Sequence, residues 1–351
     1  MFCQKKVNPA NFKTLPKVDL HRHLDGSVRV ATLRDLAVAG GFPLPSRSVR
    51  RLAPHCQVGR DCRSLADFLQ KFFFFYDFLK SPWAVERIAC EICEDAAADN
   101  VVYLETRFAP VLQATREFPM EDVVECALRG IRRGQKKFGV TVRLILCCYR
   151  SESPASSIRT VELARRYMGR GVVGVDFAGD EIRHPARPHY PAFRLAQKYD
   201  IPVTIHAGEA AGPDRVREAI ERMGARRIGH GIHSVEDRRV LDLLRKHDIT
   251  LEICPTSNVQ THVAKSYRAH PLKRLADAGI AVTVNSDDPG VSNITLTHEY
   301  RMAVRRCGLT AAQMATAVRR AADAAFCDDS TRTRIRRIID RNWFSSRRRA
   351  A

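Results

Sequence analysis

The sequence predicts a single (β/α)8 barrel of the TIM type, and three features support this fold class. Short apolar, β-branched segments alternate with segments of helical period about eight times along the 351 residues. Several of these segments are apolar on both faces, as the strands of a helix-covered parallel sheet are. No G-x-G-x-x-G sequence follows the first strand, which disfavours the alternative, an open doubly wound sheet.

The predicted strands run along the chain in regular order. They cover residues 18–24, 101–108, 140–149, 171–177, 203–206, 227–229, 249–254 and 281–285. Between them apolar residues recur at helical spacing, for instance from Val85 to Ala96, with Pro82 suited to a first helical turn. Residues 213–223 and 235–247 have the same spacing, and Gly224 is a predicted C-cap.

The connection after the first strand is too long for a βα loop. About 75 residues separate the first two strands, so a structured insertion is predicted, a helical lid over about 29–81. Its clearest helical face consists of Leu65, Phe68, Leu69 and Phe72. Because no repeat, linker or shift in composition divides the chain, we expect one domain over 1–351, ending in a basic tail over about 341–351.

Composition excludes several classes of protein. With 45% hydrophobic and 28% charged residues the chain is globular, and no apolar run approaches the ~20 residues of a membrane helix. The 11 scattered cysteines and the lack of an apolar leader predict reduced thiols in a cytoplasmic protein; Cys147 and Cys148 receive no function. The net charge of +19 suits anionic partners, but solvated helix faces explain it better, so nucleic acid is an unlikely partner.

Histidines and carboxylates follow four of the predicted strands, the first, fifth, sixth and eighth. Residues two apart on a strand face the same side, so the two histidines of the first strand project together. Barrel enzymes place their active sites at these strand ends, so we expect the groups to meet. The side chains are His21, His23, Asp25, His206, Glu209, His230, Asp287 and Asp288.

Three imidazoles and one carboxylate form a donor set that suits zinc. A catalytic zinc lowers the pKa of its water and so produces a nucleophile near neutral pH. Glu209 and His230 are then left as acid–base groups. The residues alone therefore predict metal-assisted hydrolysis.

Six segments, in order along nearly the whole chain, resemble the adenosine deaminase family of the amidohydrolase superfamily. They are His21-Arg22-His23-Leu24-Asp25-Gly26, Asp176-Phe177-Ala178-Gly179-Asp180-Glu181, His206-Ala207-Gly208-Glu209, Gly229-His230-Gly231, Cys254-Pro255-Thr256-Ser257-Asn258 and Ser286-Asp287-Asp288-Pro289. The resemblance implies a hydrolase of purine metabolism with one zinc per subunit. It would convert adenosine and 2′-deoxyadenosine to inosine and 2′-deoxyinosine with loss of ammonia.

The same resemblance implies a role for each site residue. Glu209 would donate a proton to purine N1, while His230 and Asp287 would orient the attacking hydroxide toward C6. Asp288 would hold N7, the backbone of Gly179 would meet N3, and Asp25, close to His23, would accept from the ribose 5′-OH. The helix with Leu65, Phe68, Leu69 and Phe72 would be the apolar lid over the ribose. The implied zinc ligands are His21, His23, His206 and Asp287.

Two further expectations concern Arg22, on the first strand, and Asp25, just after it. Arg22 points away from the site by strand alternation. A carboxylate at Asp25 repels a 5′-phosphate, which favours a nucleoside over a nucleotide.

Three functions stay open. The first is deamination of adenosine, and the second is deamination of another 6-aminopurine, such as an aminofutalosine-type nucleoside, N6-methyl-AMP or adenine. The third is a non-enzymatic protein that binds nucleic acid or a nucleoside through its basic surface, which the intact catalytic set argues against. The expected partner is a small-molecule nucleoside, with no membrane, and the sequence leaves the oligomeric state open.

Overall fold

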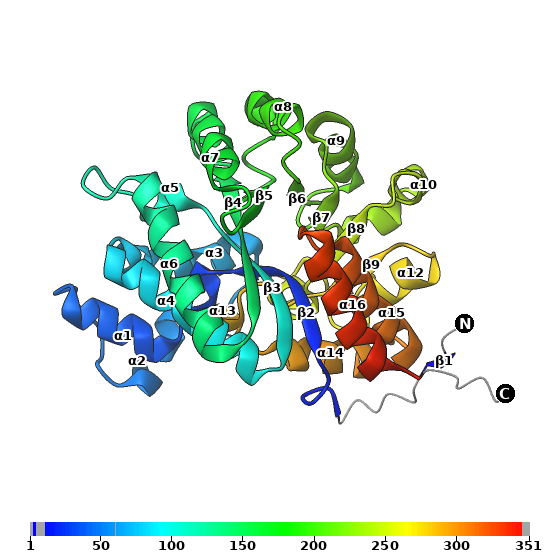
Figure 1. Cartoon of the computed structure of the whole chain (residues 1–351), viewed down its shortest axis with the longest axis horizontal. Helices are drawn as coiled ribbons and strands as arrows, with labels where there is room; N and C mark the ends of the chain where they lie inside the picture. The colour runs from blue at the N-terminus through cyan, green and yellow to red at the C-terminus, as the bar shows by residue number, and fades with distance from the viewer. Residues whose placement is uncertain (1–2, 5–10, 60, 346–351) are drawn as a thin grey trace.

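A computed structural model of the chain describes residues 3–4, 11–59 and 61–345. Its centre is a barrel of two parallel four-stranded sheets (Figure 1). The first sheet contains β2 (Lys17–His23), β3 (Val101–Phe108), β4 (Thr141–Tyr149) and β5 (Val172–Ala178). The second contains β6 (Thr204–Ala207), β7 (Arg227–His230), β8 (Thr250–Ile253) and β9 (Val282–Val284).

Single backbone bridges join the two sheets into a closed barrel. Val175 pairs with Val203 between β5 and β6, and Arg22 pairs with Asp287 beyond the end of β9. The His23 N–H donates to the Asp287 carbonyl at 2.8 Å, and the Asp287 N–H donates to the His21 carbonyl at 2.8 Å. The predicted fold class is confirmed, and all eight predicted strands are present, with no end shifted by more than one residue. The second bridge also fixes Asp287 beside the two histidines of β2.

Helices surround the strands, and their ends follow ordinary capping chemistry. Ser81 accepts from the Ala84 N–H at the start of α4, where Pro82 occupies the first turn, and α9 ends at Gly224 with φ of 70°. The helices of the barrel are α4 (Pro82–Ala98), α5 (Pro110–Gln113), α6 (Met120–Phe138), α7 (Pro154–Tyr167), η4 (Arg187–His189), α8 (Tyr190–Lys198), α9 (Pro213–Met223), η5 (Ile232–Glu236), α10 (Arg238–Lys246), α11 (Pro255–Gln260), α12 (Leu272–Asp277), α13 (Pro289–Ser292), α14 (Leu296–Arg305), α15 (Ala311–Ala324) and α16 (Asp329–Trp343).

The segment between β2 and α4 is helical. It contains η2 (Asp25–Ser27), α1 (Val30–Ala39), α2 (Val49–Cys56), α3 (Leu65–Phe73) and η3 (Tyr76–Leu79). Ser64 caps α3 by accepting from the Asp67 N–H, and Phe68 and Phe72 on its inner face are buried. This inner face lines a cavity at the carboxyl ends of the barrel strands.

The predicted basic tail begins later than expected. Arg341 belongs to α16, and β10 (Phe344–Ser345) pairs in antiparallel fashion with β1 (Cys3–Gln4). Trp343 holds this end in place, because it is fully buried, stacks on Phe12 at 5.9 Å and donates its indole N–H to the Pro16 carbonyl at 2.7 Å. The rest of the predicted tail, 346–351, lies outside the described residues. None of the described helices combines the length and the apolar character needed to cross a membrane.

Candidate active site

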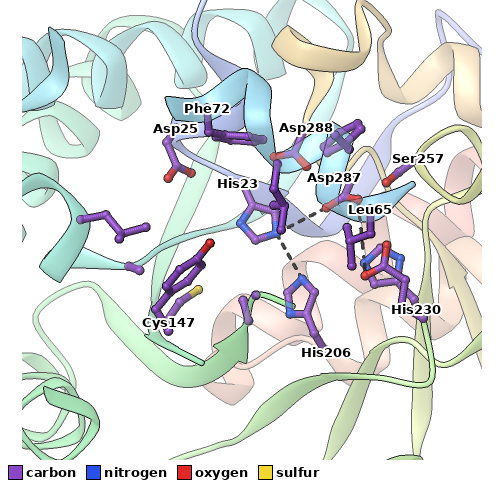
Figure 2. Close-up of a pocket in the computed structure, with 18 of the residues that line it drawn as sticks. His23, Asp25, Leu65, Phe72, Cys147, His206, His230, Ser257, Asp287 and Asp288 are labelled. Atoms are coloured by element: carbon purple, nitrogen blue, oxygen red, sulfur yellow. Dashed lines mark hydrogen bonds and ion pairs between the residues drawn. The ribbon is translucent and has the colours of Figure 1, made fainter. Parts of the chain in front are cut away.

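Four imidazoles and a carboxylate converge at the carboxyl ends of β2, β6, β7 and β9. Figure 2 shows His23, His206, His230 and Asp287 of this group. His23 Nε2 lies 3.2 Å from His206 Nε2 and 3.4 Å from Asp287 Oδ1. His21 Nε2 lies 3.2 Å from the same Asp287 oxygen. One ligand atom from each of His21, His23, His206 and Asp287 lies within 4.8 Å of the other three. The predicted ligand set is therefore brought together at one point.

Two buried carboxylates orient the histidines of this cluster. His21 Nδ1 lies 2.9 Å from Glu252 Oε2, and His206 Nδ1 lies 2.9 Å from Asp176 Oδ2. A ring whose Nδ1–H binds a carboxylate presents the lone pair of its Nε2, which is how metal-binding histidines are usually held. His21 Nε2 is buried and has no partner in hydrogen-bond geometry among the described residues.

A single arginine joins these two carboxylates. Arg107 is fully buried on β3 and donates to Asp176 Oδ2 at 3.1 Å and to Glu252 Oε2 at 2.8 Å. Burial acts to raise the pKa of both carboxyls, but Arg107 and the facing histidines outweigh it and hold both pKa values below their usual range. Sequence reasoning missed this support. Charged residues at inward positions of otherwise apolar strands were the available signal.

A second candidate set, His21, His230, Cys254 and Asp287, shares two residues with the first. Burial raises the pKa of the Cys254 thiol well above its usual value, and nearby carboxylates raise it further. A metal requires the thiolate, so the set with three imidazoles is the better ligand set.

Glu209 is held beside the cluster by an unusual carboxylate contact. Glu181 accepts from four consecutive backbone N–H groups, those of Gly208 (3.0 Å), Glu209 (2.8 Å), Ala210 (2.6 Å) and Ala211 (2.8 Å). Burial, together with the charges of Asp287 and Glu181, raises the pKa of Glu209 well above its usual value. The raised pKa favours the protonated form of Glu209, which can donate a proton.

A chain of hydrogen bonds fixes the tautomer of His230. The Leu272 N–H donates to His270 Nδ1 at 3.0 Å, so the ring proton of His270 sits on Nε2, which lies 3.1 Å from Asn258 Oδ1. The Asn258 amide then donates through Nδ2 to His230 Nδ1 at 3.1 Å. The proton of a neutral His230 consequently resides on Nε2, which faces Glu209 Oε2 at 3.7 Å and Asp287 Oδ2 at 3.8 Å. Asn258 was noted in the sequence only through its motif, and His270 was not assigned.

The cavity above these groups is lined by apolar side chains of the insertion. Leu65, Phe68, Leu69 and Phe72 of α3 line it as the sequence predicted, together with His23, Asp25, Gly179, His206, Glu209, His230, Asp287 and Asp288. His21 lies beneath it, fully buried. Tyr76, Cys147, Tyr149 and Ser257 also line the cavity and were missed. Arg22 lines a different cavity, as strand alternation required.

Two further carboxyls face this cavity in unusual states. Burial raises the pKa of Asp25 to about 6, and burial with the charge of Asp287 raises that of Asp288 well above its usual value. Asp288 Oδ1 is buried without a hydrogen-bond partner among the described residues. Gly26 makes room for Asp288, because a Cβ at this glycine would stand 1.7 Å from Asp288 Oδ1. Asp288 thus has a hydrogen-bonding atom available to a ligand.

Comparisons with known proteins identify relatives of this chain. A family model described as adenosine deaminase matches residues 16–342. A protein of Clostridium botulinum (strain 657 / Type Ba4) named adenosine deaminase is 38% identical over 330 residues, which are 94% of this chain and 100% of that protein. The solved N6-mAMP deaminase of arabidopsis is 30% identical, with a TM-score of 0.83, over 94% of this chain and 99% of that chain.

A more distant structure supports the fold alone. The adenine deaminase of Arthrobacter aurescens is 22% identical with a TM-score of 0.85, over 93% of this chain and 98% of that chain. The family model matches nearly the whole chain, and relatives named adenosine deaminase are 38% identical to it over 94% of its length. These two findings together establish the family of this chain. This chain belongs to the adenosine deaminase family.

Proposed function

We propose that the protein uses a bound zinc ion to deaminate adenosine and 2′-deoxyadenosine hydrolytically, giving inosine and 2′-deoxyinosine plus ammonia, as a step of purine metabolism. The observation that carries this proposal is Glu209, whose pKa is raised, in a cavity beside the cluster of three imidazoles and one carboxylate. Relatives named adenosine deaminase, 38% identical over nearly the whole chain, support the same substrate.

The donor set fits one zinc ion per subunit. The ligands would be His21, His23, His206 and Asp287, and the buried His21 Nε2 makes no regular hydrogen bond among the described residues and faces Asp287 at 3.2 Å. Burial lowers the pKa of both His23 and His206, which favours the neutral imidazoles that a metal requires. When bound, zinc lowers the pKa of a water ligand and so supplies the nucleophile near neutral pH.

The remaining polar groups would hold and protonate the purine. Glu209 would donate its proton to N1, which makes C6 more electrophilic. The raised pKa of Asp288 favours its protonated form, which would donate a hydrogen bond to N7, and its Oδ1 is open to such a contact. The Gly179 N–H would donate to N3, and His230, through its Nε2–H, would orient the attacking oxygen. Asp25 would accept from the ribose 5′-OH.

A nucleoside suits the cavity better than a nucleotide. The lining includes the carboxyls of Asp25, Glu209, Asp287 and Asp288, and no Lys or Arg side chain of the described residues lines it. A phosphate there would meet repulsion without a compensating cation. Solved relatives in arabidopsis include an N6-mAMP deaminase and a protein complexed with IMP, so a 6-substituted nucleotide is the second candidate substrate.

Selectivity at the 5′ position tests the proposed substrate. Asp25, with a pKa of about 6, is mostly ionised at pH 7.5 and accepts a charge-assisted bond worth about 1.5–3 kcal/mol. The wild type should prefer adenosine to 5′-deoxyadenosine by roughly ten- to a hundredfold in kcat/KM, and should discriminate more strongly against AMP. Asp25→Asn should lose activity on adenosine and narrow the gap to AMP. The exposed Asp61→Asn is the control in the same insertion, and equal turnover of AMP and adenosine by the wild type would refute a nucleoside substrate.

Glu181 acts as a positioning residue in this scheme. Glu181→Gln replaces one acceptor oxygen by an NH2 group that faces backbone donors, so the loop carrying Glu209 loses charge-assisted bonds. We expect kcat/KM to fall roughly ten- to a hundredfold, mainly through kcat, while zinc content stays unchanged. The exposed Glu162→Gln on α7 is the control. A fall confined to thermal stability would show that Glu181 has no role in placing Glu209.

The arrangement of the chain supports three further proposals. The described helices and the barrel form one domain over 1–351, with the 29–81 insertion as a lid whose α3 covers the ribose end. Substrate entry then requires movement of α3. None of the described cysteines from Cys56 to Cys327 forms a disulfide, which agrees with a reducing, cytoplasmic location.

A further inference from the structure

A second cavity, of about 580 Å³, lies on the side of β2 opposite His21 and His23. It is a half-open cavity bordered by the segment that follows β2, the end of α4, and the α13–α14 region. We propose that this cavity binds a small phosphate-bearing anion. Its charged lining residues are Lys13, Arg22, Arg29, Asp95, Asp99 and Arg301.

Arg22 provides an oriented donor in the lining of this cavity. Its side chain belongs to a residue only 6% exposed, and its Nε donates to Ser27 Oγ at 3.0 Å, which sets the plane of the guanidinium. Its Nη1 and Nη2 have no acceptor among the described residues. Burial raises the pKa of the nearby Asp19 and the Arg22 charge partly lowers it, yet no ion pair joins the two. A buried, oriented and unpaired guanidinium edge matches two oxygens of a phosphate.

The acidic residues of the cavity are already engaged. Asp95 accepts from Arg29 Nη2 at 2.6 Å, and Asp99 accepts from the Thr297 N–H at 2.8 Å and from its hydroxyl. Lys13 and Arg301 have no ion pair within the described part of the chain. Four cations against two acids leave an excess of two positive charges in the lining. A dianion would balance that excess.

The excess of positive charge also affects the pKa of the nearby buried Lys17. Burial lowers its pKa to about 8, Asp99 opposes this shift, and the charges of Arg301 and Lys13 add to it. The cavity is also larger than one phosphate group needs. It has room for the sugar of a phosphate ester, so orthophosphate and a sugar phosphate are both possible sources of the shared anion. This inference does not depend on the proposed reaction.

Calorimetric titration of the metal-loaded full chain tests the proposal. Orthophosphate and ribose 5-phosphate are titrated separately at constant ionic strength, with saturating inosine present to fill the candidate active site. We expect one saturable site per chain for at least one of the two anions. Tighter binding of ribose 5-phosphate would identify an ester as the ligand, and binding of orthophosphate alone would identify free phosphate. Heats equal to those of a chloride titration for both anions would overturn the proposal.

Matched variants locate the site. Arg301→Gln should weaken binding about tenfold or more, because a charge-assisted contact is lost. Arg239→Gln on α10, exposed and remote from the cavity, removes the same charge and should leave the affinity unchanged. Arg22→Gln should weaken binding at least as much, with zinc content and circular dichroism measured to confirm an intact neighbouring strand. Equal weakening by Arg301→Gln and Arg239→Gln, or displacement of the anion by inosine, would refute this location.

Discussion

Glu209→Gln is expected to lower kcat for adenosine by about 10²–10⁴-fold while zinc content and adenosine binding stay near those of the wild type. The glutamine amide fills nearly the same volume, but it cannot deliver the acidic proton that N1 requires. Burial and the charges of Asp287 and Glu181 raise the pKa of Glu209 and so favour its protonated form. Steady-state kinetics, elemental analysis and a binding titration measure the three quantities.

The exposed Glu162→Gln serves as the control for this substitution, since it makes the same chemical change on the outside of α7. It should match the wild type in kcat and KM. If Glu209→Gln retained near-native kcat, another group would have to be the proton donor, and the proposed role of Glu209 would be wrong.

Loss of the metal should abolish deamination altogether. Exhaustive chelation, or substitution of a ligand by Asp287→Ala or His21→Ala, should reduce activity to background and lower the zinc content toward zero. The melting temperature should fall as well, because a metal that binds only the folded state stabilises it. Zinc restored to the chelated wild type should recover both activity and melting temperature.

The neighbouring carboxyls provide a matched pair for this test. Asp287 lies 3.2 Å from His21 Nε2 and belongs to the candidate ligand set, whereas Asp288 is adjacent in sequence but outside it. Asp288→Asn should therefore keep its zinc and raise KM, while Asp287→Asn should lose zinc. Full activity of a preparation shown by elemental analysis to contain no metal would contradict the mechanism.

Much of the fold was predictable because the buried strands have a strong local pattern. The segments 101–108 and 213–223 were placed to the residue, since each combines an apolar run or stripe with clear Gly or Pro boundaries. The expected start of the basic tail, at about residue 341, differs from the structure. Arg341 looked like part of a basic tail, but the burial of Trp343 against Phe12 extends α16 past it, and that contact joins residues far apart in sequence.

The site residues were predictable where they lie at the carboxyl ends of predicted strands. The strand ends alone predict that His21, His23, His206 and Asp287 meet, whereas the family resemblance is what singles these four out as ligands. Their supporting groups were not predicted. Arg107 and Glu252 are 145 residues apart. No local spacing pairs two such positions, and only the closed barrel brings them into contact.

The bridge formed by Arg107 also limits how this barrel can be recombined with its relatives. Arg107 and Asp176 lie in the first sheet, whereas their partners Glu252 and His206 lie in the second. A chimaera that took one half of the barrel from a homologue lacking these side chains would leave a buried charge without its partner at the junction of the two sheets. Removing one member of a buried pair costs about 3–5 kcal/mol. Half-barrel exchange should therefore succeed only between homologues that carry the whole ionic bridge, however similar their apolar cores are.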